Sequence, residues 1–351
     1  MLTILFICTL GLCFIKATNK YALKPKPVEL AIPEGWPKPV YDLSKNPLTE
    51  EGIALGLKLF YDDRLSRDGN FSCGSCHQQF AAFATFNHPF SHGIDNSFTV
   101  RNAPGLFNLA WKPAFMYDGG ILHLDAQPLA PLTASNEMGE TIENVLNKLK
   151  KDSTYRSMFK AAFGDEKINT QRMTKALSQF MLTLVSNNSK YDKVMRGEEK
   201  FTAMEQRGYE LFKSKKCISC HTEPFFTDFS YRDIGLTADS VLKDYGRYKI
   251  LNNSSDSLKF MVPSLRNVWV TAPYGHDGRF YSINDAIEHY RTGVVPSPNT
   301  DSLVKNGIPF TTDELYQIRA FLFTLTDKTF LKDPRFTLSG YQPKQVDNHS
   351  H

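Results

Sequence analysis

The sequence predicts a mostly α-helical protein built from two similar halves with long loops between the helices. Helical periodicity of apolar residues dominates the chain, and no segment shows the strict alternation of a half-buried strand. Short motifs also recur in the same order in the two halves. Gly56-Leu57-Lys58-Leu59-Phe60 in the first half corresponds to Gly208-Tyr209-Glu210-Leu211-Phe212 in the second.

We expect each of these repeated segments to be an amphipathic helix. Four further helices are predicted by apolar residues on one face and by caps at their ends: 141–151, 171–185, 282–290 and 312–325. Thr312 and Asp313 are the expected caps of the last of these helices. Two later loops also match, since Tyr117-Asp118-Gly119-Gly120 corresponds to His276-Asp277-Gly278-Arg279.

Each of the two repeated helical segments is followed by a Cys-x-x-Cys-His pentapeptide. These are Cys73–His77 in the first half and Cys217–His221 in the second. This pattern is the attachment site of c-type haem, in which the cysteines form thioethers and the histidine is the proximal iron ligand. The expected cofactors are therefore two covalently bound haem c groups, one on Cys73, Cys76 and His77 and one on Cys217, Cys220 and His221. The haems supply the apolar surface around which short helices pack. The fold class becomes two cytochrome c-like haem domains related by duplication.

A zinc site is the main rival, because Cys-x-x-Cys is ambiguous by itself. One zinc shared by both motifs would join ligands 144 residues apart, whereas finger-type ligand pairs lie close in sequence. Of six cysteines, the two outside the motifs, Cys8 and Cys13, lie in an apolar N-terminal stretch. A chain that lost this stretch would have no cysteine left for a disulfide.

The apolar stretch Leu2–Ile15 is short for a membrane span and fits a secretory signal peptide cleaved after Ala17. We favour cleavage over an uncleaved anchor, and we expect a periplasmic protein, because c-type haem is attached outside the inner membrane of bacteria.

The expected organisation is a signal peptide at 1–17, a Pro-rich arm at 18–47, haem domains at 48–195 and 196–335, and a polar tail at 336–351. The arm is interpreted either as an extended segment on the surface or as a plain linker. With 41 basic and 37 acidic residues, the charge gives no argument for nucleic acid.

Taken together, these motifs resemble those of the bacterial diheme cytochrome c peroxidases and their relative MauG. The likeness runs from about Leu48 to Leu325 and includes 59–66, Arg101–Pro104, Asn136–Gly139, Pro263–Asn267 and Ala272–Arg279. In that family the N-terminal haem reacts with hydrogen peroxide, and the C-terminal haem takes electrons from a small donor protein, a cytochrome c or a copper protein. Family members often form homodimers.

By this resemblance Glu137 matches the catalytic glutamate, and Gln127 and Pro131 match other pocket residues. Peroxide cleavage needs a group that moves a proton between the two oxygens, which a distal carboxylate can do. The alternatives are a surface Glu137 that caps the helix near Thr141, and loop-shaping roles for Gln127 and Pro131. His92 is the candidate for the removable distal ligand of the first haem, with His88 as a competitor and a solvent-facing loop histidine as the alternative.

Two positions depart from the peroxidase pattern. Tyr117 stands where the family usually has a tryptophan that relays electrons between the haems, and Trp111 is nearby in sequence. Tyr290 stands where peroxidases have a methionine ligand of the second haem, and MauG also has tyrosine there. An anionic tyrosine ligand lowers the potential, whereas methionine raises it. His289 and Met261 are the alternative ligands, but neighbouring helix residues point about 100° apart, so only one of His289 and Tyr290 should face the iron.

The resemblance also implies one calcium ion between the domains. Its donors match Asn102, Thr271 and Pro273, few of them charged, with water completing the shell. The alternative is that Asn102 only hydrogen-bonds loop backbone.

These observations favour a peroxidase that reduces hydrogen peroxide to water with electrons from a small periplasmic redox protein. The first alternative is a MauG-like oxidase that acts on a protein or an organic substrate, which Tyr290 favours. The second is a plain electron-transfer cytochrome, against which Glu137 argues because a simple carrier needs no distal acid.

Overall fold

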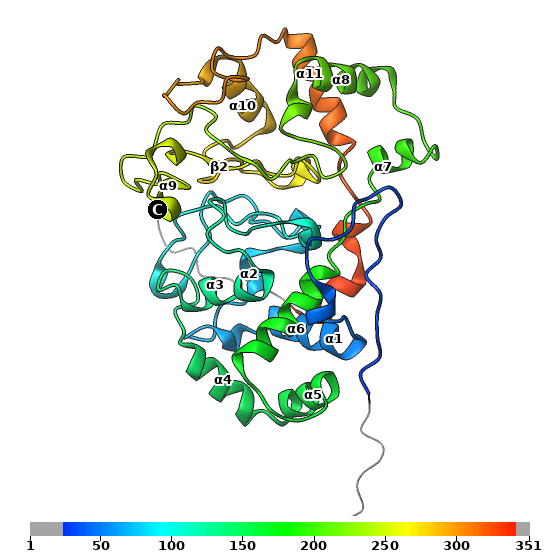
Figure 1. The fold of residues 1–351 in the computed structure, drawn as a ribbon, viewed down its shortest axis with the longest axis vertical. Coiled ribbons are helices and arrows are strands. Elements are labelled where there is room, and N and C mark those ends of the chain that lie inside the picture. The colour runs from blue at the N-terminus through cyan, green and yellow to red at the C-terminus, as the bar shows by residue number, and fades with distance from the viewer. Residues whose placement is uncertain (1–23, 342–351) are drawn as a thin grey trace, which may run out of the picture.

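The computed structural model describes residues 24–341 and shows a helix-rich fold with very little sheet (Figure 1). The only strands among these residues are β1 (Tyr231–Arg232) and β2 (Phe260–Met261), which pair antiparallel. The helices are α1 (Glu50–Phe60), α2 (Cys73–Cys76), α3 (Leu129–Thr133), α4 (Ile142–Lys151), α5 (Ser153–Phe163), α6 (Thr170–Leu182), α7 (Lys190–Met195), α8 (Ala203–Ser214), α9 (Tyr248–Leu251), α10 (Ile283–Glu288) and α11 (Thr312–Phe323).

All six predicted helices are present, with small shifts at their ends. The helix predicted at 171–185 is α6, which ends at Leu182, and the one predicted at 312–325 is α11, which ends at Phe323. The expected cap of α11 was wrong by one residue. Thr311 is the N-cap, and it forms a capping box with Glu314.

The signal peptide predicted at 1–17 lies outside the described residues. No helix within residues 24–341 has the length and apolar character needed to cross a membrane.

Two hydrophobic cores divide the described chain. The larger core gathers apolar side chains of α1, α4, α5 and α6, and the smaller core gathers those of α8, α10 and α11. Figure 1 shows the two groups of helices one above the other, with the loops that carry β2 and α9 between them.

A helix pair of the same geometry forms the centre of each core. α1 packs on α6 in the first half, and α8 packs on α11 in the second. A Cβ atom at Gly56 would overlap the carbonyl of Ala176, and a Cβ at Gly208 would overlap the carbonyl of Gln317. Each glycine therefore allows two helix backbones to come close at the crossing.

A second feature recurs after each haem motif. Asn108 and Asn267 both adopt positive φ, and each precedes a short 3-10 helix. Each backbone N–H donates to a carbonyl that follows the long helix of its half, Leu184 for Asn108 and Leu325 for Asn267. Asn108 and Asn267 are therefore equivalent positions in the two halves.

The N-terminal arm is docked on the protein surface along residues 24–47. The Val28 N–H donates to the Leu48 carbonyl, and the Val40 N–H donates to the Ala110 carbonyl. The Trp36 ring lies 5.0 Å from the ring of Trp111 and 4.8 Å from that of Phe225. Because Trp111 belongs to the first half and Phe225 to the second, the arm contacts both halves.

The chain after α11 returns to the first half and packs beside α6 (Figure 1). The Tyr61 hydroxyl donates to the Phe336 carbonyl, and the hydroxyls of Ser72 and Tyr341 lie 2.7 Å apart. Residues 336–341, which the sequence assigned to a polar tail, are thus in contact with the first haem motif.

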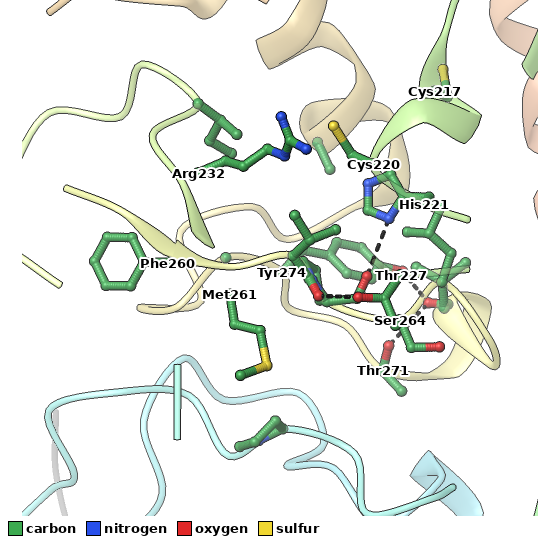
Figure 2. Close-up of a pocket in the computed structure, with 18 of the residues that line it drawn as sticks. Cys217, Cys220, His221, Thr227, Arg232, Phe260, Met261, Ser264, Thr271 and Tyr274 are labelled. Carbon is green, nitrogen blue, oxygen red and sulfur yellow. Dashed lines mark hydrogen bonds between the residues drawn. The ribbon is translucent and has the colours of Figure 1, made fainter. Parts of the chain in front are cut away.

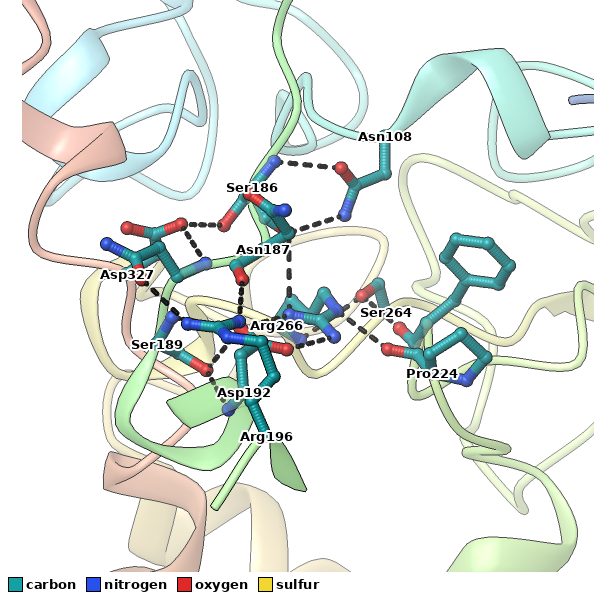
Figure 3. A network of polar contacts seen from close by, with 12 residues as sticks. Asn108, Ser186, Asn187, Ser189, Asp192, Arg196, Pro224, Ser264, Arg266 and Asp327 are labelled. Atoms are coloured by element: carbon teal, nitrogen blue, oxygen red, sulfur yellow. Dashed lines mark hydrogen bonds and ion pairs between the residues drawn. The ribbon is translucent and has the colours of Figure 1, made fainter. Parts of the chain in front are cut away.

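A buried polar network joins the two halves (Figure 3). The Asn108 side chain exchanges hydrogen bonds with the backbone of Ser186, whose hydroxyl accepts from the Asn267 amide. Arg266 donates two hydrogen bonds to the Asp192 carboxylate, at 2.8 and 3.0 Å. The relative position of the halves is therefore fixed by directional bonds as well as by apolar packing.

Candidate haem sites and peroxidatic centre

The first Cys-x-x-Cys-His motif forms a single helical turn, α2. The Cys73 and Cys76 side chains are free thiols, as are those of Cys217 and Cys220, in the described part of the chain. His77 donates from Nδ1 to the carbonyl of Phe83 at 2.6 Å, which leaves Nε2 as the atom available to a metal. Burial lowers the pKa of His77 and keeps the imidazole neutral, as an iron ligand must be.

The second motif repeats this arrangement in a 3-10 turn, Cys217–Ser219. Nδ1 of His221 lies 3.1 Å from the carbonyls of both Phe226 and Pro263, and burial lowers its pKa. Figure 2 shows His221 and Cys220 facing the same hollow, with Thr227 and Ser264 beneath the imidazole.

A cavity of about 340 Å³ opens beside the second motif. Most of its wall is apolar, and its lining includes Phe212, Ile287, Ile318, Leu322 and Tyr290 together with both cysteines and His221. A planar apolar group attached to Cys217 and Cys220 would lie against this apolar wall, and His221, whose Nδ1 faces the carbonyls of Phe226 and Pro263, has Nε2 left to bind a metal. The residues present therefore fit a c-type haem.

The zinc alternative finds no support in the geometry. Within residues 24–341, no cluster of three or more His, Cys, Asp or Glu side chains is placed to hold a metal ion. Each motif instead lies against a different hydrophobic core.

Glu137 lies beside the first motif. Burial raises the pKa of the Cys73 and Cys76 thiols, and the charge of the nearby Glu137 carboxylate raises both further. Burial raises the pKa of Glu137 itself, so the carboxyl holds a proton more readily than a surface glutamate does. The cap of α4 is Thr141, and the buried Glu140 carboxylate accepts from its N–H, so Glu137 does not cap this helix.

The loop that carries His92 packs between Glu137 and the first motif. The Ile94 N–H donates to the Glu137 carbonyl at 2.9 Å, and a Cβ at Gly93 would overlap the Asn136 backbone. On the other side, the Ser91 hydroxyl interacts with the thiol of Cys76. His92 is half-buried, whereas its competitor His88 is exposed, and the two rings are 5.7 Å apart.

Gln127 lies just before α3, and Pro131 lies within it. The Pro131 carbonyl accepts from the Met138 N–H, which shapes the loop that holds Glu137. In the described part of the chain the Gln127 side chain makes no hydrogen bond to Glu137. The structure thus connects Pro131 to Glu137 through backbone, and leaves the role of Gln127 as a prediction.

Tyr117 lies between the two halves. It comes from the first half, yet it lines the cavity of the second motif, and its carbonyl accepts from the Met261 N–H of β2 at 2.7 Å. Burial raises the pKa of its phenol. Trp111 lies outside this cavity, where its Nε1–H donates to the Pro37 carbonyl. Of the two aromatic residues considered for electron relay, Tyr117 is the one in the cavity.

Tyr290 and His289 point in different directions, as the helical spacing predicts. Tyr290 lines the cavity near Cys217 and Cys220, and burial raises its pKa. His289 Nε2 instead donates to the Ile234 carbonyl at 2.9 Å. Met261 also lines the cavity, but Figure 2 shows its thioether directed toward the loops of the first half and away from His221.

Asn102, Thr271 and Pro273 all line the same cavity. The Asn102 side-chain nitrogen donates to the carbonyls of His88 and Pro89, as the backbone interpretation predicts. The amide oxygen of Asn102 and the Pro273 carbonyl remain the donor types that calcium prefers.

Sequence reasoning overlooked one buried ion cluster and one half-buried cation. Arg101 pairs with Asp118 of the first half at 2.6 Å and with Asp244 of the second half at 2.6 and 2.8 Å. Lys112 lines the large cavity. A basic residue within an apolar aromatic stretch, Ala110-Trp111-Lys112-Pro113, was the only signal for Lys112.

Comparison with known proteins places this geometry among haem peroxidases. The family model described as di-haem cytochrome c peroxidase matches residues 50–200. The chain is 34% identical to a methylamine utilization protein MauG of Methylophilus methylotrophus, over 75% of this chain and 78% of that protein. It is 33% identical to a cytochrome c551 peroxidase of Nitrosomonas europaea, over 84% of each.

Solved structures share the fold. A crystal structure of a MauG-like protein associated with microbial copper homeostasis superposes with a TM-score of 0.80 at 30% identity, over 88% of this chain and 99% of that one. The diheme peroxidase BthA from Burkholderia thailandensis gives a TM-score of 0.71 at 23% identity, over 81% of this chain and 88% of that one, which shows a common fold.

Proposed function

Because the chain belongs to the family of di-haem cytochrome c peroxidases and MauG proteins, we propose that it reduces hydrogen peroxide to water. The electrons come from a small periplasmic redox protein, a cytochrome c or a copper protein. Membership makes the chain an oxidoreductase and implies two haem c groups, one for each Cys-x-x-Cys-His motif.

The observation that carries the proposal is the position of Glu137 beside Cys73 and Cys76. An acid held next to a haem attachment motif, with its pKa raised by burial, has no role in a plain electron carrier. It suits the cleavage of peroxide, which takes up two electrons and two protons and yields two water molecules.

The residues of the first half have separate tasks. The haem iron, when bound, supplies the open coordination position for peroxide and the electrons for its reduction. Glu137 would accept a proton from one peroxide oxygen and return it to the other, as a general base and then a general acid. Gln127 orients the peroxide or the Glu137 carboxyl. His92, on the loop packed against Glu137, would be the removable group that closes this pocket in the resting form.

The residues of the second half handle electrons. Tyr290 would be a second protein ligand of the haem iron besides His221, and Tyr117 would relay electrons between the two halves. Three observations support these roles: Tyr290 and Tyr117 line one cavity, His289 is turned away to the Ile234 carbonyl, and the Met261 thioether is directed away from His221.

A second candidate function is a MauG-like oxidase that removes electrons from a protein or an organic molecule. The specific observation that favours it is Tyr290 in the cavity of the second motif, because an anionic tyrosine ligand lowers the potential and stabilises oxidised iron. Such an iron is a poor entry point for electrons from a high-potential donor.

We also propose that the protein is periplasmic, that the two halves arose by duplication, that it forms a homodimer and that one calcium ion binds at Asn102, Thr271 and Pro273. The matched crossings at Gly56 and Gly208 support the duplication.

The test is peroxide-dependent oxidation of a reduced small cytochrome c by the haem-loaded protein, measured with and without prior one-electron reduction. Fast turnover is expected, and a requirement for prior reduction would point to His92 as a removable ligand. No turnover, with the haem bands still shifting on addition of peroxide, would favour the oxidase. Irons that are six-coordinate and low-spin in every redox state would favour a plain electron carrier.

A further inference from the structure

Lys112 places a positive charge in the wall of the cavity beside the second motif, and within residues 24–341 this charge has no partner of opposite sign. It follows the 3-10 helix Leu109–Trp111 and precedes Pro113, so its backbone direction is fixed on both sides. Its side chain is only partly exposed and lines the cavity, and its ammonium nitrogen lies 6.0 Å from the centroid of the Phe115 ring. Among residues 24–341, no carboxylate or hydrogen-bond acceptor is paired with the Lys112 ammonium.

The other buried or half-buried cations of this cavity already have partners. Arg266 is bound to Asp192, Arg232 is bound to Asp228 and Asp301, and Lys215 is bound to Glu314. Lys216 also lines the cavity but is exposed to solvent. Lys112 therefore differs from the other cations of the wall, because it combines partial burial with the absence of a partner in the described part of the chain.

Burial of an unpaired charge is unfavourable, and a protein normally pairs such a group or neutralises it. Burial indeed lowers the pKa of the Lys112 ammonium to about 8 when only the protein surrounds it. A second charge of opposite sign in the cavity would restore the ordinary state of the ammonium. The structure thus indicates an anionic ligand at this end of the cavity.

We propose that Lys112 binds a propionate carboxylate of the haem attached at Cys217 and Cys220. A haem is apolar over most of its surface and carries its carboxylates at one edge, which matches an apolar wall with one unpaired ammonium. Lys112 comes from the first half of the chain, whereas Cys217, Cys220 and His221 come from the second. The ion pair would therefore hold the haem of one half to a loop of the other.

This role also bears on the redox potential. A positive charge near the haem favours the reduced state, which carries one positive charge less than the oxidised state. Lys112 would thus raise the potential of the second haem and offset part of the lowering by an anionic Tyr290. The inference rests on haem attachment and not on the substrate, so it stands whether the protein is a peroxidase or an oxidase.

The test compares Lys112→Met, Lys112→Arg and Lys38→Met in the haem-loaded protein. Lys38 is an exposed lysine near Trp111, in a hollow outside this cavity, and its replacement removes the same charge. The readouts are the midpoint potential of the second haem by spectroelectrochemistry from pH 5 to 8, and the number of haems per chain from the pyridine haemochrome spectrum.

We expect Lys112→Met to lower the midpoint potential and to make it more dependent on pH, because the unpaired propionate then takes up a proton on reduction. Lys112→Arg should restore both properties, and Lys38→Met should match the unsubstituted protein. Loss of one haem in Lys112→Met with two haems in Lys112→Arg would also support the proposal. A Lys112→Met protein that matches Lys38→Met in potential and in haem content would overturn it.

A second measurement needs no variant, so its result does not depend on whether a substituted chain folds. Acetylation of the haem-loaded protein by acetic anhydride, followed by mass spectrometry, reports how accessible each amine is. A paired Lys112 should react much more slowly than Lys38. Equal rates of acetylation at the two lysines would also overturn the proposal.

Discussion

The Arg266 guanidinium and the Asp192 carboxylate form a two-point ion pair in which the Arg266 side chain is only 1% exposed. The same guanidinium lies 4.9 Å from the ring centroid of Trp36 in the N-terminal arm. One buried charge pair thus lies against the arm and belongs to the polar network between the halves.

We expect Asp192→Asn to destabilise the protein by about 3–5 kcal/mol, because it leaves a buried guanidinium without its counter-charge. Urea unfolding at pH 7 measures the loss. The control is the double variant Asp192→Leu with Arg266→Leu, which removes both charges and should lose less. If the double variant lost as much as the single one, packing around Arg266 and not charge pairing would be the cause.

The same pair predicts a dependence on pH. Burial alone would raise the pKa of Asp192, but hydrogen bonds and charge from Arg266 outweigh it, and the net effect lowers the pKa. The stability that this shift contributes is present above the unfolded pKa of about 3.9, and it is lost as the pH falls through the folded value. Asp192→Asn should therefore show a smaller loss of stability than the unsubstituted protein between pH 5 and pH 3. Parallel stability curves over this range would contradict the prediction.

Gly208→Ala should destabilise the second half by about 1–3 kcal/mol, because the added methyl group would overlap the Gln317 carbonyl and push α8 from α11. Unfolding followed at the absorbance of the second haem measures the change. Met204→Ala, at an exposed position of the same helix, is the control and should change little. Equal stability of the two variants would mean that the crossing of α8 and α11 accommodates the added methyl group.

Glu137→Gln should reduce kcat for peroxide turnover by about 10²- to 10⁴-fold, because an amide cannot take up and return the proton. The haem spectra in the absence of peroxide should be unchanged. Glu143→Gln, at an exposed position in the first turn of α4, is the matched control. Unchanged turnover in Glu137→Gln would remove the acid–base role.

Tyr290→Phe should change the absorption and electron paramagnetic resonance spectra of the second haem, because it removes the phenol oxygen while keeping the ring. Tyr281→Phe, 66% exposed and just before α10, is the control and should leave the spectra unchanged. Spectra of Tyr290→Phe that match those of the control would rule out Tyr290 as a ligand.

The sequence was most informative where chemistry is local. A haem attachment site is five consecutive residues, so Cys73–His77 and Cys217–His221 could be located without any knowledge of the fold. The paired glycines Gly56 and Gly208 were visible as a repeat, although only the structure shows that each lies at a helix crossing. The choice between Tyr290 and His289 could be limited to one residue by helical geometry, but it needed the position of the Ile234 carbonyl to point His289 away from the cavity.

Contacts between distant residues could not be predicted in this way. Arg266 and Asp192 are 74 positions apart, and no local sequence pattern in either segment predicts that they form a pair. The helix α5 was overlooked because its buried residues, Tyr155, Phe159 and Ala162, are few and lie among charged ones. The cap of α11 was misplaced because Thr311 and Thr312 are both good caps, and only the bond to Glu314 distinguishes them.

The return of the chain onto the first half sets an order of events during biogenesis. Ser72 and Tyr341 are in contact although 269 positions separate them, and Tyr61 receives its hydrogen-bond partner from Phe336. The turn Cys73–Cys76 is therefore translated long before the segment that covers it. During this interval the thiols are open to the machinery that joins haem to them. The last segment would then cover the attachment turn only after the haem has been joined to it.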